Sequence, residues 1–338
     1  MTMAPIRRKK PNDFDDMNKT DSETNKKPLL ILAGPTAVGK TECSLLLAEK
    51  LGGEIISADS MQVYKGMDIG TAKALPEERK RVRHHLIDVC SPTEEYNVVR
   101  YKEEASAAID DICSRGKIPI LTGGTGFYIQ AVLKDTDFTE NASDRAYREM
   151  LEETEREQPG SLYKMLLEAD PKAALEIHPN NIKRVVRALE FHHASGECIS
   201  DHNAREKERV SPYSFLFVVL ERDREELYRR IDRRVDQMLE DGLYEETVRL
   251  RTAGCARNMV SMQGLGYKEM LAYIDGETSY EETVRLIKRN TRHYAKRQLT
   301  WFKRIPDTIW LDCAGWDNAA CLSDHIISLW KNRQNNQE

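Results

Sequence analysis

The sequence predicts an α/β fold, in which a mostly parallel sheet has helices on both faces and carries an inserted all-helical subdomain. Short apolar segments rich in β-branched residues alternate with longer helical patterns, as is typical of a parallel sheet buried on both sides. A glycine-rich loop follows the first apolar segment. Roughly ninety residues separate the fourth and fifth segments, far more than one crossover needs, and they carry only helical patterns.

Each predicted strand is bounded by turn residues. The six strands are expected at residues 29–33, 54–59, 85–89, 118–122, 215–220 and 308–311. The helical patterns of the insertion cover residues 146–157, 161–169, 171–177 and 181–194. We therefore expect a core domain formed by residues 28–137 and 207–315, which includes a basic C-terminal helix, and a helical insertion domain at residues 138–206.

The composition indicates a protein without a membrane segment. No apolar run approaches the ~20 residues that span a bilayer, and residues 1–27 lack the apolar part of a secretory signal. Residues 1–27 are polar and are expected to form a disordered tail. Seven scattered cysteines without a C-x-x-C pair argue against a zinc ribbon or a disulfide framework and favour the reducing cytoplasm. The net charge of −5 indicates no particular partner, and a monomer is the default expectation.

The most specific motif is the loop between the first strand and the helix after it. The loop matches G-x-x-x-x-G-K-[ST] and consists of Gly34, Pro35, Thr36, Ala37, Val38, Gly39, Lys40 and Thr41. Its glycines let backbone N–H groups face a phosphate, Lys40 adds a charge, and the Thr41 hydroxyl suits Mg²⁺. A chance match is disfavoured because a strand precedes the loop and an amphipathic helix follows it. The loop predicts binding of a diphosphate or triphosphate, and it does not say which molecule carries that group.

Two further strand ends point to the same crevice, because ligands of an open α/β sheet lie beyond the carboxyl ends of its strands. Asp59 follows the second strand, where a carboxylate can ligate Mg²⁺, act as a general base or cap a turn. Thr125 follows the fourth strand in a glycine-rich turn before an apolar helical run. A helix cap would explain Thr125 by itself. Beside the other two elements, Thr125 is also expected to contact a substrate.

Basic residues are concentrated on two helices expected after the fifth strand. Arg230 and Arg234 lie four residues apart, where they either clamp phosphate oxygens or pair with Asp232 and Asp236 on a solvated surface. Farther along, residues 284–305 contain no acidic residue, while basic side chains recur every three or four positions. A stripe of one sign repels itself, and its usual compensation is a polyanion. Interleaved aromatic side chains suit stacking on unpaired bases, and a basic face that binds nothing is the alternative.

Together these motifs resemble the tRNA dimethylallyltransferase family. The phosphate loop matches, as does the long run Asp59–Lys73, which is distinctive of that family. Further matches lie at residues 123–128 (with Phe127 in place of the usual Leu), 181–190, 264–269 and 296–303. The resemblance covers residues 28–312 and implies a P-loop NTPase-like core. The remaining C-terminal residues hold no Cys/His zinc finger, which favours the bacterial type.

The resemblance implies transfer of a dimethylallyl group from dimethylallyl diphosphate to N6 of adenosine 37, beside the anticodon of tRNAs that read codons beginning with U. It implies that the phosphate loop, with Arg230 or Arg234, holds the diphosphate and that Mg²⁺ on Thr41 is the cofactor. Lys40 would stabilise the leaving group, Asp59 would be the general base, and Thr125 would contact the adenine. The insertion would close over the anticodon stem-loop. The residues implied to contact the tRNA are Asp59, Ser60, Met61, Gln62, Thr125, Arg148, Lys183, Arg184, Val185, Val186, Arg187, Gly264, Leu265, Gly266, Tyr267, Lys268, Glu269, Lys296, Arg297, Gln298, Leu299, Thr300, Trp301, Phe302 and Lys303.

Elementary chemistry agrees with these roles. An exocyclic amine is a weak nucleophile, so a carboxylate that takes its proton helps, and the base must leave its stack to reach the crevice. Three other interpretations stay open: an isopentenyltransferase acting on free AMP, ADP or ATP, a small-molecule kinase, and a non-enzymatic RNA-binding module. The basic helix and the large insertion disfavour the first, and no second set of lid arginines supports the second. The intact Lys40, Thr41 and Asp59 count against the third.

Overall fold

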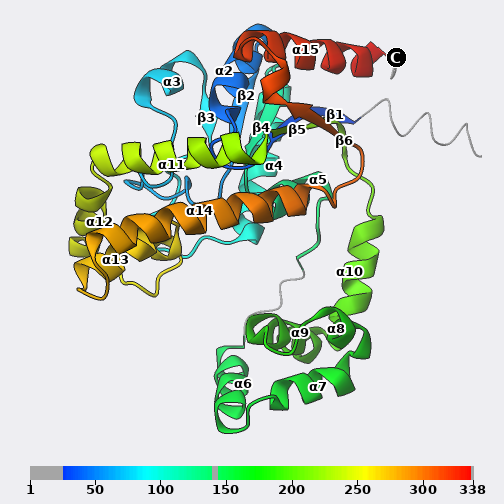
Figure 1. Cartoon of the computed structure of the whole chain (residues 1–338). Coiled ribbons are helices and arrows are strands. Elements are labelled where there is room, and N and C mark those ends of the chain that lie inside the picture. Colours follow the sequence, from blue (N-terminus) through cyan, green and yellow to red (C-terminus); the bar gives the residue numbers. More distant parts are fainter. Residues whose placement is uncertain (1–25, 139–143, 336–338) are drawn as a thin grey trace, which may run out of the picture. The chain divides into compact units, whose positions relative to one another are not determined.

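The core of the protein is a parallel sheet, shown in Figure 1 for a computed structural model that describes residues 26–138 and 144–335. The strands of the described residues are β1 (Lys27–Ala33), β2 (Glu54–Ala58), β3 (His84–His85), β4 (Pro119–Gly123), β5 (Tyr213–Glu221) and β6 (Thr308–Asp312). They lie in the order β3-β2-β4-β1-β5-β6, and every neighbouring pair is parallel. The predicted α/β fold with its parallel sheet is confirmed.

Helices cover both faces of the sheet because its central strand is apolar on both sides. In β1, Leu29 and Ile31 belong to one buried cluster and Leu30 and Leu32 to another. The first cluster is covered by α4 (Val98–Ser114) and α5 (Gly126–Leu133), and the second by α2 (Lys40–Leu51) and α15 (Ala319–Asn335). The sheet is therefore the middle of three layers.

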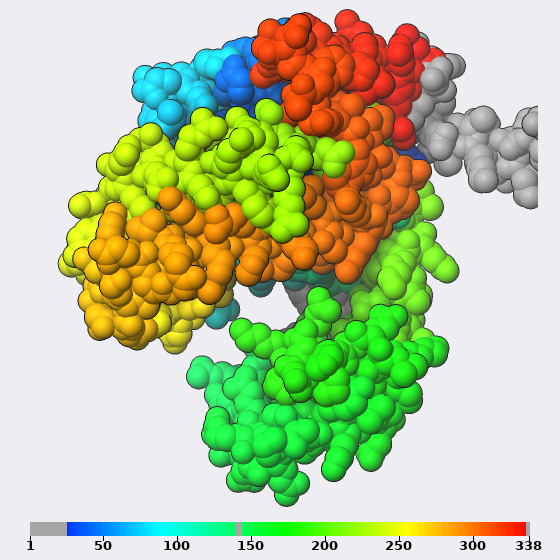
Figure 2. Space-filling model, in the orientation of Figure 1, coloured from blue at the N-terminus to red at the C-terminus, as the bar shows by residue number. Residues whose placement is uncertain are grey.

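Two long helices, α11 (Arg224–Glu240) and α14 (Tyr280–Phe302), lie side by side against this core, as Figure 2 shows for the yellow-green and orange segments. The shorter elements of the same unit are α3 (Pro76–Arg81), α12 (Leu243–Thr252), η1 (Ser261–Gln263), α13 (Tyr267–Ile274) and η2 (Cys313–Gly315). In the ranges that the structure describes, no helix combines the length and apolar character needed to cross a bilayer.

A second compact unit, Lys134–Ser211, is all helical in its described part and has its own core. Its helices are α6 (Arg145–Glu157), α7 (Ser161–Ala169), α8 (Pro171–Glu176), α9 (Ile182–Ser195) and α10 (Ile199–Glu208). Leu151, Leu162 and Val185 are fully buried in that core. The sequence placed this insertion at residues 138–206. Because this unit has its own hydrophobic core, its helices pack against one another.

Three predictions about elements need correction. The third strand is only His84–His85, since Leu86 and Asp88 adopt left-handed backbone (φ of 60° and 58°) and leave the ladder. The strand β1 begins at Lys27, inside the predicted tail; residues 1–25 of that tail lie outside the described residues. The helices α10 and α15 were not predicted, because their apolar spacing is weaker than that of the helices beside them.

Candidate active site

A cavity of about 370 Å³ brings many of the predicted site residues together. Its wall contains residues 36–41 of the phosphate loop, the residues that follow β2, the end of β4, and residues 263–268. Side chains of α11 and α14 complete the lining. Every lining residue belongs to the unit that contains the sheet. The carboxyl ends of parallel strands are where such a fold places its ligands.

The phosphate loop is curled and braced from outside. Gly39 has a φ of 115°, a left-handed conformation that strains any residue with a side chain. Arg222 Nε donates a hydrogen bond to the Val38 carbonyl at 2.9 Å, and Arg230 Nε donates to the Ala37 carbonyl at 2.8 Å. Because two arginines hold these carbonyls, the curvature of the loop does not depend on a ligand.

Lys40 sits at the start of α2 with its ammonium group turned onto the loop. Its Nζ donates to the carbonyls of Gly34 at 2.8 Å and Pro35 at 2.7 Å. Burial, together with the positive charge of Arg234, lowers the pKa of Lys40 to about 7. An anion bound in the loop would reverse part of this shift, because it favours the charged lysine. Thr41 lines the cavity beside Lys40.

The two arginines of α11, Arg230 and Arg234, differ in their position relative to the cavity. Arg234 lines the cavity, and burial followed by the charge of Arg230 lowers the pKa of its guanidinium. Arg230 is not a lining residue, and its Nε is engaged with the Ala37 carbonyl. The prediction that the pair clamps a diphosphate therefore fits Arg234 by position, whereas Arg230 supports the loop.

The basic stripe of α14 is partly neutralised by acidic residues of α11. Arg292 pairs with Asp232 at 2.8 Å, and Lys288 pairs with Asp236 at 2.5 Å. The expectation that a polyanion compensates the whole stripe is wrong for these positions. So is the alternative in which the two aspartates pair with arginines of their own helix. The partners lie on a neighbouring helix, which a pattern within one helix does not show.

Asp59 follows β2 directly and lines the cavity together with Lys40. Its Oδ1 accepts a hydrogen bond from the Met61 N–H at 2.9 Å. Burial raises the pKa of Asp59, while the Met61 amide and the charges of Lys40 and Arg234 act in the opposite direction. A carboxylate with a raised pKa is a stronger base than an exposed one, so Asp59 suits proton abstraction.

Thr125 precedes α5, and its carbonyl accepts from the N–H groups of Tyr128 and Ile129, as a capping residue does. Its Oγ1 accepts from the Ser60 N–H at 3.1 Å, and its side chain is hydrogen-bonded to Tyr294. Ser60 and Tyr294 line the cavity, whereas Thr125 does not. Thr125 thus lies behind the wall and braces the residues that form it, and its contact with the adenine stays a prediction.

Gln298 of α14 is buried and connects two of the predicted elements. Its Oε1 accepts from the Thr36 N–H at 2.9 Å, and its Nε2 donates to the Gly124 carbonyl at 3.0 Å. It lines the cavity and holds the phosphate loop against the end of β4, and its RNA contact stays a prediction. Gln62 also lines the cavity, and its Oε1 accepts from the Ser57 hydroxyl at 2.9 Å.

The other residues predicted to contact RNA fall into three groups. Those that line the cavity are Gly264, Leu265, Gly266, Tyr267, Lys268 and Arg297. Those with exposed side chains outside it are Lys183, Arg184, Arg187, Lys296, Thr300 and Lys303. Those buried or half-buried against apolar clusters are Val185, Val186, Leu299, Trp301 and Phe302. The side chains of Val185, Val186 and Phe302 are buried because helical periodicity turns these positions toward a core, and the RNA contact of these residues stays a prediction.

Two charged residues predicted to contact RNA are already paired inside the protein. Glu269 is buried, and its Oε2 accepts from the Gly266 N–H at 2.9 Å at the start of α13. Arg148 forms a two-fold hydrogen-bonded pair with the buried Glu190, at 2.7 and 2.8 Å. Both residues therefore hold local structure in place.

Sequence reasoning missed three residues at this site. Arg222 braces the phosphate loop, His84 lines the cavity, and Glu246 of α12 binds the backbone of a loop in the cavity wall. Arg222 follows β5 directly, so the strand-end rule that selected Asp59 would also have found it. Glu246 lies on a helix far along the chain, and no spacing links it to the loop that it contacts.

A phosphate loop and a buried carboxylate that open on one cavity of a parallel sheet define an α/β enzyme acting on a phosphorylated substrate. The comparisons with known proteins narrow that class. A family described as IPP transferase matches residues 62–305. The chain is 56% identical over 303 residues to a tRNA dimethylallyltransferase of Lachnoclostridium phytofermentans, covering 89% of this chain and 97% of that protein. A second tRNA dimethylallyltransferase, from Alkaliphilus oremlandii, is 46% identical over 311 residues and covers 92% and 99%.

Solved structures agree. The crystal structure of the tRNA isopentenylpyrophosphate transferase of Bacillus halodurans matches with a TM-score of 0.70 and 42% identity, covering 92% of this chain and 99% of that one. A eukaryotic dimethylallyltransferase described as acting on tRNA matches with a TM-score of 0.80 and 34% identity, covering 92% and 80%. This chain belongs to the IPP transferase family, and the relatives from Lachnoclostridium phytofermentans and Alkaliphilus oremlandii are named tRNA dimethylallyltransferases.

Proposed function

We propose that this protein transfers the dimethylallyl group of dimethylallyl diphosphate to N6 of adenosine 37 in tRNAs that read codons beginning with U, and releases diphosphate. The observation that carries the proposal is the shared cavity of the phosphate loop and Asp59. One end supplies cationic and N–H groups for a diphosphate, and the carboxylate stands where an acceptor would lose its proton. The relatives that carry this family name support the choice of donor and acceptor.

The reaction exchanges one bond for another. A C–N bond forms between N6 and the allylic carbon, while the C–O bond to the diphosphate breaks and its electron pair leaves with the oxygen. Asp59 takes the proton that N6 gives up, which prevents positive charge from building on the nitrogen. The raised pKa of Asp59 supports this role, because it makes the carboxylate a stronger proton acceptor than an exposed aspartate.

The leaving diphosphate is the group that the cationic end of the cavity suits. Lys40, Arg234 and the N–H groups of the loop are fixed in position and face developing negative charge. Mg²⁺ fits here only as an ion shared with the substrate, since no cluster of three acidic, His or Cys ligands exists among the described residues. Thr41 would hold it through the hydroxyl, and the ion would neutralise diphosphate charge.

The acceptor is proposed to be RNA because the protein exposes many basic side chains, which a mononucleotide acceptor would not need. Lys296 and Lys303 are exposed on or directly after α14, and Lys183, Arg184 and Arg187 are exposed on α9 of the helical unit. Phosphates of an anticodon stem-loop would pair with such groups. The target adenine would leave its stack to enter the cavity, at a cost of a few kcal/mol that is smaller in a loop than in a duplex.

The place and assembly of the protein are part of the same proposal. Its proposed substrate and its seven cysteines, all unpaired, support a cytoplasmic enzyme. A monomer is proposed as the default assembly.

The test measures transfer of label from dimethylallyl diphosphate to an anticodon stem-loop with adenosines at positions 36 to 38, with AMP as a parallel acceptor and Asp59→Ala alongside. The proposal expects labelled RNA, unlabelled AMP, and loss of transfer in the variant. Label on AMP alone would assign the protein to cytokinin-type synthesis. Absence of transfer to either acceptor would reject the proposed reaction.

A further inference from the structure

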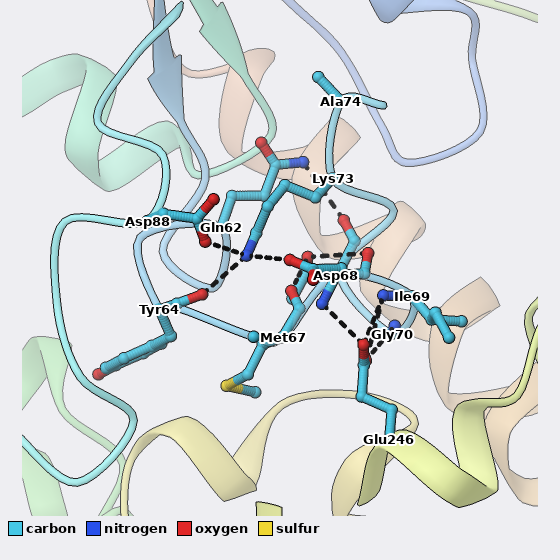
Figure 3. Close-up of polar contacts among 12 residues, drawn as sticks. Gln62, Tyr64, Met67, Asp68, Ile69, Gly70, Lys73, Ala74, Asp88 and Glu246 are labelled. Atoms are coloured by element: carbon cyan, nitrogen blue, oxygen red, sulfur yellow. Dashed lines mark hydrogen bonds and ion pairs between the residues drawn. The ribbon is translucent and has the colours of Figure 1, made fainter. Parts of the chain in front are cut away.

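A buried carboxylate outside the reacting groups binds the backbone of the cavity wall. Glu246 of α12 is buried, with 1% of its side chain exposed. Its carboxylate accepts hydrogen bonds from three consecutive N–H groups, those of Asp68 at 3.0 Å, Ile69 at 3.1 Å and Gly70 at 3.1 Å. Figure 3 shows these donors converging on Glu246 from one turn. Such a row of N–H groups is an anion-binding arrangement, and here the protein supplies the anion itself.

The same carboxylate also binds the opposite wall. The Tyr267 hydroxyl donates to Glu246 Oε1 at 2.6 Å, and burial together with that negative charge raises the pKa of Tyr267. The Tyr267 ring packs directly on Gly70, where a Cβ atom would lie 2.5 Å from the ring. Only glycine permits this approach. Glu246 therefore fastens the turn at Asp68–Gly70 to the first residue of α13.

Both fastened segments line the cavity. Gly70, Thr71 and Ala72 form part of one wall, and Gly264–Lys268 forms part of another. The first wall is connected to the site of chemistry through Gln62, whose Nε2 donates to the carbonyls of Thr71 at 3.3 Å and Ala72 at 3.4 Å. Gln62 follows Asp59 by three residues, so a shift of this turn reaches the proposed base.

The other side of the turn is held by a second buried charge. Lys73 Nζ donates to Asp68 and Asp88, each at 2.7 Å, and to the Tyr64 carbonyl at 2.8 Å (Figure 3). With Glu246 on one side and Lys73 on the other, the turn has no freedom to relax alone. Stability does not require such an arrangement, since buried charges cost desolvation that apolar residues avoid. A fixed geometry does require it.

We propose that Glu246 is a positioning residue that sets the spacing between the two walls that receive the acceptor nucleotide. The inference rests on the proposed function, and it assigns Glu246 an effect on the acceptor and none on the diphosphate. The phosphate loop is braced independently by Arg222 and Arg230. Loss of Glu246 should therefore leave the diphosphate site as it is.

The test compares Glu246→Gln with Glu245→Gln, a control on the same helix that removes the same charge from an exposed side chain. The amide of Glu246→Gln presents an NH₂ group to the backbone donors, so at least one donor loses its acceptor. We expect the KM for the stem-loop to rise at least about tenfold, because an unsatisfied buried donor distorts the wall. The dissociation constant of inorganic diphosphate, measured by calorimetry, should stay within about twofold. Glu245→Gln should match the wild type.

A second variant guards against simple unfolding. Tyr267→Phe keeps the ring on Gly70 and removes only the hydroxyl, so it should raise the KM in the same direction with a smaller loss of thermal stability. All measurements are made well below the melting temperature of each variant. An unchanged KM in Glu246→Gln, or equal losses of diphosphate affinity and RNA affinity, would overturn the assignment. Inactive wild-type protein would reject the proposed function and this inference together, whereas active wild type with a normal variant rejects only the inference.

Discussion

At the scale of single residues, the proposed reaction uses two ionisable groups whose pKa values are shifted in opposite directions by their environments. Burial raises the pKa of Asp59 and lowers that of Lys40 to about 7. Each shift disfavours the charged form in the ligand-free cavity. In the proposed reaction, a negatively charged diphosphate would favour the charged form of Lys40, and Asp59 would take the proton that leaves N6. Both shifts therefore fit the proposed substrates.

Replacement of Asp59 tests its role as base. We expect Asp59→Asn to lower kcat by about 10²–10⁴-fold while diphosphate still binds, because the amide keeps the shape and cannot take a proton. In the wild type, kcat/KM should fall as acid protonates Asp59. Because the pKa is raised, the midpoint should lie above the ~3.9 of an ordinary aspartate. A pH profile with its acidic limb at or below that value would contradict the assignment.

The lowered pKa of Lys40 predicts proton uptake when diphosphate binds. With a pKa of about 7, free Lys40 is mostly neutral at pH 8, and the bound anion raises its pKa and protonates it. Calorimetry in buffers of different ionisation enthalpy should therefore show net proton uptake at pH 8. Lys40→Met should lose that part of the uptake and bind diphosphate more weakly. Equal uptake in the two proteins would place the titrating group elsewhere.

At the scale of elements, local sequence patterns predict the strands and helices, but they do not predict which of these elements contact one another. The buried strand β1 and the loop after it were readable from the sequence, as was Asp59 at a strand end. The acidic partners of α14 were not, since Asp232 and Asp236 lie more than fifty residues before the basic residues that they neutralise. Such contacts depend on which helices are neighbours in the fold. The spacing of residues within one helix does not show which helix lies beside it.

The start of β2 offers a test of element-level stability. Glu54 has 3% of its side chain exposed and bonds to Arg115, Lys117 and His85, which joins β2 to β3 and to the segment before β4. Glu54→Ala should lower the free energy of unfolding by about 1–2 kcal/mol, because it removes the common acceptor of the partly exposed Arg115 and Lys117, whose charges water can still solvate. Urea unfolding of the two proteins at pH 7 measures the difference.

The difference in the free energy of unfolding between wild type and Glu54→Ala should depend on pH. The Arg115 hydrogen bond, followed by those of Lys117 and His85, holds the pKa of Glu54 well below its usual range against the effect of burial. A lowered pKa in the folded state stabilises the protein above the unfolded pKa of ~4.3, and this contribution is lost as pH falls toward the folded value. The difference between wild type and Glu54→Ala should shrink below pH ~4. A difference that grows with acid would contradict this explanation.

At the scale of the whole molecule, two units with separate cores share one chain, and basic side chains are exposed on both. The average charge of −5 conceals these local groups. RNA binding should therefore weaken steeply with salt, because each phosphate contact releases counterions.

Single substitutions on α14 test whether its exposed basic side chains contact RNA. Lys296→Ala and Arg297→Ala should each reduce the slope of log K against log salt for stem-loop binding by about one unit or slightly less. Lys331→Ala, which removes an exposed lysine from α15, should leave the slope unchanged. Fluorescence anisotropy over a series of salt concentrations gives the slopes. Equal slopes in all four proteins would exclude this part of α14 from the RNA contact.

The most direct measurement places both acceptors in one reaction. Wild-type protein, dimethylallyl diphosphate, the anticodon stem-loop and AMP at equal concentrations are incubated together. The RNA is then separated from AMP and cut by a base-specific ribonuclease, and the RNA fragments and the recovered AMP are analysed separately by mass spectrometry. We predict that the added C₅H₈ unit is found on N6 of adenosine 37 of the RNA and that AMP stays unmodified. Modification of AMP in preference to the RNA, or of a different position in the stem-loop, would contradict the proposed function.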